Sequence, residues 1–270
     1  MLAQRLITAA IGIPILVGVI LLGGIVYAIV AGVILALASI EFCAIADRSD
    51  ESRPLWRPRF PALAAAAGIG LIVAGAEAGF DEWGGAIAAA IALTLVVALL
   101  RADPPRDFGG WLAAATAVAY IGFLGSHFVL LRNLDDDGKW VLLAVLGTWA
   151  TDTFAYAAGR LFGRRKIAPR ISPGKTVEGT AAAVVGGLAS VFFLGEVFDL
   201  PMSTAEALLL CLLFPPFAII GDLAESFVKR GAGVKDTSDL VPGHGGFLDR
   251  LDSLLFTVPL VYYFAIWVVL

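Results

Sequence analysis

Long apolar runs follow one another through most of this chain, and each has about the twenty residues that a helix needs to cross a membrane. The runs are continuously apolar, whereas the strands of a membrane barrel alternate apolar and polar residues. Helices are expected at residues 6–22, 25–46, 62–78, 83–100, 111–131, 140–161, 177–194, 205–227 and 254–270. The sequence therefore predicts an all-α, polytopic integral membrane protein with about nine transmembrane helices.

The composition supports this class and excludes others. Hydrophobic residues make up 59% of the 270 residues, more than soluble domains contain. A second apolar run follows the first almost at once, so the first is expected to be an uncleaved helix rather than a signal peptide. Cys43 and Cys211 lie in separate apolar runs and predict neither a disulfide nor a zinc site. No basic domain is present, which argues against nucleic acid as a partner.

The basic residues predict the orientation. If the N-terminus is cytoplasmic, nearly all of the 19 Lys and Arg lie in cytoplasmic segments, and only Arg132 and Lys139 lie outside. Cytoplasmic loops of membrane proteins carry such an excess of positive charge. We therefore expect a multi-pass protein with a cytoplasmic N-terminus.

The polar clusters gather in the second half of the chain. One membrane domain is expected over residues 1–270, in which the helices of 1–108 have a packing role. Residues 109–270 form the predicted catalytic half, with cytoplasmic loops at 162–176 and 228–253.

Four acidic residues lie inside predicted spans and more than one residue from the span ends, where ionisable side chains are costly: Glu41, Asp152, Asp222 and Glu225. All four are expected in the cytoplasmic halves of their helices. Asp222, Glu225 and Lys229 share a helix face. For Glu225 and Lys229 alone an ordinary ion pair is the favoured interpretation, whereas Asp222 favours function. Glu41 is interpreted as a buried partner of a basic residue, and Pro215-Pro216 is expected to break or kink the helix.

The segment after this helix combines glycines, bases and acids. Glycines such as Gly245 and Gly246 allow close approach of a phosphate to the backbone. Asp249 and Asp252 are expected to open the last helix, so that Asp222 and Asp249 can meet across a helix pair. Carboxylates together with phosphate oxygens are the ligands that Mg²⁺ prefers. Positive charge comes from Lys229, Arg230, Lys235 and Arg250.

A third cluster lies between residues 151 and 178. Asp152 is followed by a basic run at 160–170. Control of topology and attraction of substrate are equally favoured interpretations of this run. Gly174-Lys175-Thr176 is not a P-loop, because the required first glycine is absent and no strand is expected before it. Lys175 and the following helix start can still hold an anion. Ser172, Lys175 and Glu178 therefore favour function.

The spacing of these residues resembles that of the phosphatidate cytidylyltransferases, also called CDP-diglyceride synthases. The resemblance rests on Ser226-x-x-Lys229-Arg230-x4-Lys235-Asp236 and Pro242-Gly243-His244-Gly245-Gly246-x-x-Asp249-Arg250-x-Asp252-Ser253. Asp152, the Ser172-to-Gly179 segment and the Gly221-to-Ser226 segment support it. The segment Thr237-Ser238-Asp239 departs from the pattern without removing a charged group.

The resemblance implies a bacterial inner-membrane enzyme that converts CTP and phosphatidic acid into CDP-diacylglycerol and pyrophosphate. It also implies Mg²⁺, a monovalent cation such as K⁺, and a homodimer, with Asp222 and Asp249 as metal ligands. The expected catalytic residues are Lys229, Arg230, Lys235, Asp236, His244, Arg250 and Asp252. The expected substrate-binding residues are Asp152, Ser172, Lys175, Glu178, Glu225, Ser226, Gly245 and Gly246.

Two other functions stay open at this point. A CTP-dependent lipid-alcohol kinase would share a nucleotide site and a membrane fold. An ion-coupled transporter would use Asp152, Asp222 and Glu225 as carriers, but the chain shows no internal repeat.

Overall fold

The computed structural model describes residues 2–46, 60–101, 104–241 and 245–270, and these are almost entirely helical. The elements are α1 (Leu2–Leu22), α2 (Gly24–Ala46), α3 (Phe60–Ala78), α4 (Phe80–Arg101), α5 (Pro104–Ala117), a π-helical segment η1 (Val118–Phe123), α6 (Leu124–Arg132), α7 (Lys139–Phe162), β1 (Lys166–Ala168), β2 (Ser172–Thr176), α8 (Val177–Val197), α9 (Thr204–Gly231), α10 (Leu248–Leu251), α11 (Leu254–Phe264) and a π-helical segment η2 (Ala265–Val269).

Eight helical segments of the described chain are long and apolar enough to cross a membrane. One of them, Phe108–Arg132, joins α5, η1 and α6, and another, Leu248–Val269, joins α10, α11 and η2. The first predicted run is present within α1, where Ala10–Leu22 forms a shorter apolar helix. The prediction of an all-α, polytopic membrane protein is confirmed.

The prolines Pro215-Pro216 do not break the helix, because α9 is helical without interruption from Thr204 to Gly231. The alternative, a kink at the prolines, stays a prediction. Proline is tolerated in a membrane-crossing helix where neighbouring groups accommodate it. Here Pro215 packs against Gly187 of α8, where an added Cβ would lie 2.8 Å from the proline ring.

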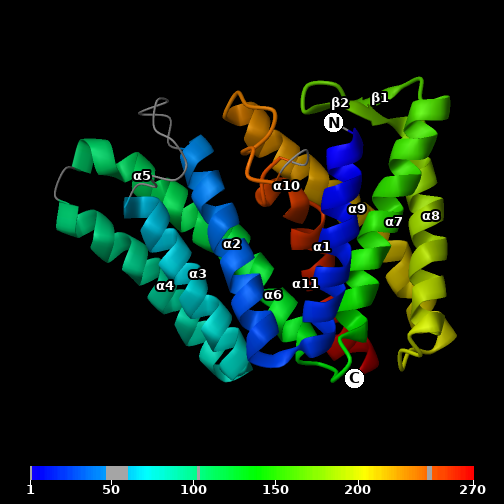
Figure 1. The fold of residues 1–270 in the computed structure, drawn as a ribbon, viewed down its shortest axis with the longest axis horizontal. Helices are drawn as coiled ribbons and strands as arrows, with labels where there is room; N and C mark the ends of the chain where they lie inside the picture. The colour runs from blue at the N-terminus through cyan, green and yellow to red at the C-terminus, as the bar shows by residue number, and fades with distance from the viewer. Residues whose placement is uncertain (1, 47–59, 102–103, 242–244) are drawn as a thin grey trace.

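The helices form two groups that the last span connects (Figure 1). In one group α3 packs against α2, α4 and α5, and in the other α8 packs between α7 and α9. α11 contacts α6, α7 and α9, so it joins the two groups. The β1–β2 hairpin and the N-terminal end of α1 lie at the same end of the bundle (Figure 1).

At the opposite end, the buried guanidinium of Arg132 holds the end of α1. Its nitrogens donate to the carbonyl oxygens of Ile20 (2.6 Å), Leu21 (3.3 Å), Asp135 (2.6 Å) and Asp136 (2.8 Å). Carbonyls at a helix C-terminus lack partners within the helix, and a cation there also complements the helix dipole. Gly23 has a positive φ of 61°, and a side chain there would lie against the guanidinium.

Arg132→Met is therefore expected to lower the free energy of unfolding by about 3 kcal/mol, because it leaves buried carbonyl oxygens without donors. Thermal unfolding in detergent measures the change. Arg101→Met, on the exposed end of α4, serves as the comparison. Equal stability of the two variants would contradict this role of Arg132.

Candidate active site

Asp249 is a buried carboxylate that receives hydrogen bonds from three directions. Lys229 Nζ donates to Oδ1 at 2.6 Å. Oδ2 accepts from Thr237 N (2.9 Å), Thr237 Oγ1 (2.8 Å) and Gly246 N (2.8 Å). The predicted position at the start of the last span is confirmed, since Asp249 lies in α10. These contacts join α9 and the segment that precedes α10.

Lys229 is the shared counter-ion of two carboxylates. Besides Asp249, it pairs with Glu225 at 2.7 Å, and the two side chains are 12% and 1% exposed. The predicted Glu225–Lys229 pair is thus present, but it is buried rather than solvated. One ammonium of α9 thus serves two carboxyl groups, one on α9 itself and one on α10.

Asp222 forms an ion pair with a different lysine. Lys175 of β2 reaches Asp222 Oδ2 at 2.5 Å, and Ser226 Oγ lies 3.4 Å from Oδ1. The ion pair connects the β1–β2 hairpin with α9. Asp222 also interacts electrostatically with Asp152 and Asp252.

A close approach of two chain segments brings these acids together. A Cβ added at Gly221 would lie 2.7 Å from Asp252 O and 2.8 Å from Ser253 Cα, so α9 meets the start of the last span at this glycine. Asp152 of α7 interacts electrostatically with Asp252, and also with Lys175 and Arg250. Residues far apart in the sequence therefore form what we call the polar centre: Asp152, Lys175, Asp222, Lys229, Asp249, Arg250 and Asp252.

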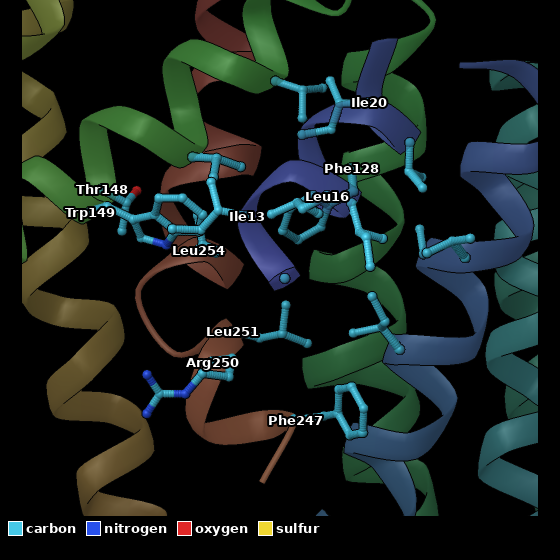
Figure 2. Close-up of a pocket in the computed structure, with 18 of the residues that line it drawn as sticks. Ile13, Leu16, Ile20, Phe128, Thr148, Trp149, Phe247, Arg250, Leu251 and Leu254 are labelled. Carbon is cyan, nitrogen blue, oxygen red and sulfur yellow. The ribbon is translucent and has the colours of Figure 1, made fainter. Parts of the chain in front are cut away.

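This polar centre borders a cavity of about 640 Å³. Figure 2 shows Ile13, Leu16, Phe128, Leu251 and other apolar side chains around the cavity, with Arg250 toward one end. The charged lining residues are Asp152, Asp249, Arg250 and Asp252. An apolar cavity with charged groups at one end suits an amphiphilic ligand.

The hairpin carries several of the predicted residues. β1 and β2 pair antiparallel, and Ser172 is half-buried opposite Ala168. Glu178 accepts from the backbone N–H groups of Arg164 (2.9 Å) and Arg165 (3.3 Å). In the structure, Glu178 therefore holds the base of the hairpin.

The remaining predicted residues lie in or near the loop after α9. Arg230 donates to Ile171 O (3.3 Å) and Val234 O (3.0 Å), so it links the hairpin to the end of α9. Lys235 and Asp236 are exposed, and His244 lies outside the described residues. Gly245 adopts a positive φ of 83°, and a side chain there would approach Asp249 Oδ2.

Glu41 was not among the predicted site residues, yet α2 places it against the same segment. It accepts from Thr237 Oγ1 (3.1 Å), Ser238 Oγ (2.6 Å), Phe247 N (3.0 Å) and Leu248 N (2.9 Å). Among the described residues its hydrogen-bond partners are hydroxyl and amide groups rather than the expected base. The sequence signal that could have identified Glu41 was its position. It is an acidic residue near the end of a predicted span, on the same side of the membrane as Asp152, Asp222 and Glu225.

The donor chemistry suits a hard cation only together with a substrate. Within the described chain, no three Asp, Glu, His or Cys side chains form a ready metal site. Mg²⁺ is usually held by one or two carboxylates plus substrate phosphates. Asp222 and Asp249 provide two carboxylates, each with a lysine beside it.

A model of the cytidylyltransferase family matches residues 3–268, nearly the whole chain. The chain belongs to this family. A phosphatidate cytidylyltransferase of Pseudomonas aeruginosa is 32% identical over 271 aligned residues, which cover 96% of this chain and 95% of that protein. The match therefore includes the N-terminal helices.

Other relatives match over a little more than half of this chain, 54% and 56% for the two that follow. A phosphatidate cytidylyltransferase of Bacillus subtilis is 43% identical over 148 residues, and one of Staphylococcus epidermidis is 38% identical over 152 residues. These alignments span about half of the relatives' length, 55% and 58% respectively.

Proposed function

We propose that this protein transfers the cytidylyl group of CTP to phosphatidic acid, which gives CDP-diacylglycerol and pyrophosphate. The observation that carries the proposal is the near full-length similarity to the Pseudomonas aeruginosa phosphatidate cytidylyltransferase. The charged groups at one end of an apolar cavity support it, since phosphatidic acid combines an anionic head with acyl chains. We place the reaction at the cytoplasmic face of a bacterial inner membrane, in agreement with the distribution of basic residues.

In the proposed reaction, a phosphate oxygen of phosphatidic acid attacks the α-phosphorus of CTP. The new oxygen–phosphorus bond replaces the bond to the bridging oxygen, and pyrophosphate leaves with that electron pair. No covalent enzyme intermediate is required. The task of the protein is then to align two anionic substrates and to compensate their repulsion. Arg250, Lys175 and Lys229 lie at the polar centre and provide positive charge there.

We propose that Asp222 and Asp249 hold Mg²⁺ when the nucleotide binds, with a monovalent cation such as K⁺ nearby. A bound divalent cation supplies charge compensation for the nucleotide phosphates. Lys175 and Lys229 pair with these carboxylates in the structure. The same two lysines would then be available to hold phosphate oxygens of the substrates. The protein is proposed to act as a homodimer.

The test uses the purified full-length protein with labelled CTP, phosphatidic acid and Mg²⁺. Label in the lipid phase together with released pyrophosphate is the expected result. CDP as the released nucleotide would instead identify a lipid kinase, and nucleotide-independent ion flux in liposomes would identify a transporter. Either result, or no lipid labelling with active phosphatidic acid preparations, would contradict the proposal.

A further inference from the structure

Glu41 is a buried carboxylate in a membrane-crossing helix, far in the sequence from the residues that bind it. The side chain is fully buried, and an isolated charge at such a place is strongly disfavoured. From the part of the chain that the structure describes, each of its oxygens accepts two hydrogen bonds, all from neutral donors. The ionised carboxylate is thereby stabilised without a described counter-ion, because hydrogen bonds to a charged acceptor are stronger than neutral ones.

The donors come from both ends of one loop. Thr237 and Ser238 lie at its beginning, and Phe247 and Leu248 lie where the last span begins. One further described backbone link within it runs from Val241 N to Gly245 O at 2.8 Å. A single carboxylate of α2 thus accepts hydrogen bonds from both ends of this loop. We call Glu41 and these four donor residues the Glu41 clamp.

The clamp shares Thr237 with the surroundings of Asp249, and Gly246 lies beside both carboxylates. Thr237 Oγ1 lies 3.1 Å from Glu41 Oε2 and 2.8 Å from Asp249 Oδ2. Gly246 donates to Asp249 Oδ2, and a Cβ added at Gly246 would lie against Thr237 Oγ1 and the carboxylate of Glu41. Glycine at this position therefore allows the Glu41 carboxylate to lie against the Gly246 backbone, whose N–H donates to Asp249.

We propose that Glu41 is a positioning residue of the active site: it holds Thr237 and Gly246 so that their donors fix the orientation of the Asp249 carboxylate. The inference rests on the proposed function, in which Asp249 binds Mg²⁺ with the nucleotide. Residues that orient a metal ligand act through that ligand and do not contact the substrate. Glu41 meets this condition, since its described hydrogen bonds come from the four donors of the clamp and none comes from Asp249 itself.

Glu41→Gln is the main variant, because it keeps the shape of the side chain and replaces one acceptor oxygen with a donor. The amide nitrogen then faces a donor of the clamp. Turnover is expected to fall by about 10- to 100-fold, as for other residues that orient a metal ligand. The Mg²⁺ concentration needed for half-maximal activity should rise, while KM for phosphatidic acid should stay close to that of the wild type. Glu41→Asp should recover part of the lost turnover, because it retains the charge.

Phe42→Leu is the matched control, since Phe42 is the next residue of α2, is buried like Glu41, and packs its ring against that of Tyr120. It should reduce stability without changing the Mg²⁺ dependence. Ser238→Ala removes one donor to Glu41 without touching Asp249, so it tests the clamp if Glu41→Gln fails to fold. Combined with Glu41→Gln, it should add little further loss, because both changes break the same contact.

Hydrogen exchange separates this inference from the proposed function. In Glu41→Gln, the amides of Phe247 and Leu248 should exchange faster than in the wild type, and in Phe42→Leu they should not. Unchanged exchange would overturn the clamp, and faster exchange with wild-type turnover and Mg²⁺ dependence would overturn the positioning role. If the wild-type protein does not make CDP-diacylglycerol, the proposed function fails, and the positioning role fails with it, whereas the exchange rates still decide whether the clamp exists.

Discussion

Replacing Asp249 with Asn is expected to reduce turnover by at least about 100-fold, the scale on which charge-stabilising groups contribute to catalysis. The substitution keeps the size of the side chain but removes the charge that pairs with Lys229. It also turns an amide nitrogen toward one of the groups that now donate to the carboxylate, either Lys229 or the Thr237 and Gly246 donors. The initial rate of lipid labelling from CTP measures the effect.

Asp222→Asn is expected to give a loss of the same order, because the second proposed cation ligand is then neutral. Asp239→Asn is the matched control, since Asp239 is an exposed carboxylate of the loop between α9 and α10 and has no assigned role. All three variants should elute as folded protein in detergent. Near wild-type turnover in both Asp222→Asn and Asp249→Asn would remove these carboxylates from the catalytic site.

Lys229→Met is expected to lower the free energy of unfolding by about 3–5 kcal/mol, the range found when one partner of a buried ion pair is removed. The ammonium is the described counter-ion of both Glu225 and Asp249, whose side chains are 1% and 4% exposed. Without it, two nearby carboxylates remain buried with no cation between them. Thermal or denaturant unfolding in detergent, without added Mg²⁺, measures the loss.

Lys139→Met is the comparison for this effect. Lys139 pairs with Asp137 at 3.4 Å, and the side chains are 38% and 70% exposed. Exposed pairs contribute only about 0–1 kcal/mol, because solvent screens them. If Lys229→Met and Lys139→Met were equally stable, the Lys229 pairs would contribute no more than surface pairs.

The helices could be predicted from the sequence because each apolar run must satisfy its backbone internally in lipid. The runs at 25–46 and 177–194 differ from α2 and α8 by a few residues at most. The helix is not broken at Pro215-Pro216, where the local tendency of proline to interrupt a helix is overcome. The contact of Pro215 with Gly187 joins residues of two different helices, so nothing near the prolines in the sequence indicates it.

The candidate site was predicted in its residue types more fully than in its contacts. The Glu225–Lys229 pair follows from helical spacing and is present. The Lys175–Asp222 pair joins residues 47 positions apart by sequence number, and the four donors of Glu41 lie about 200 positions away. No periodicity relates residues at such separations.

The sequence by itself determined that this chain crosses a membrane many times and carries acids and bases at one end of its spans. It did so because hydropathy, charge distribution and helical periodicity are local properties that need no knowledge of the partners. Only the tertiary structure decided which carboxylate each lysine binds, and that Glu41 of the N-terminal half holds the loop beside Asp249. Those pairings depend on how helices pack against one another, and packing brings together residues whose separation along the chain carries no signal.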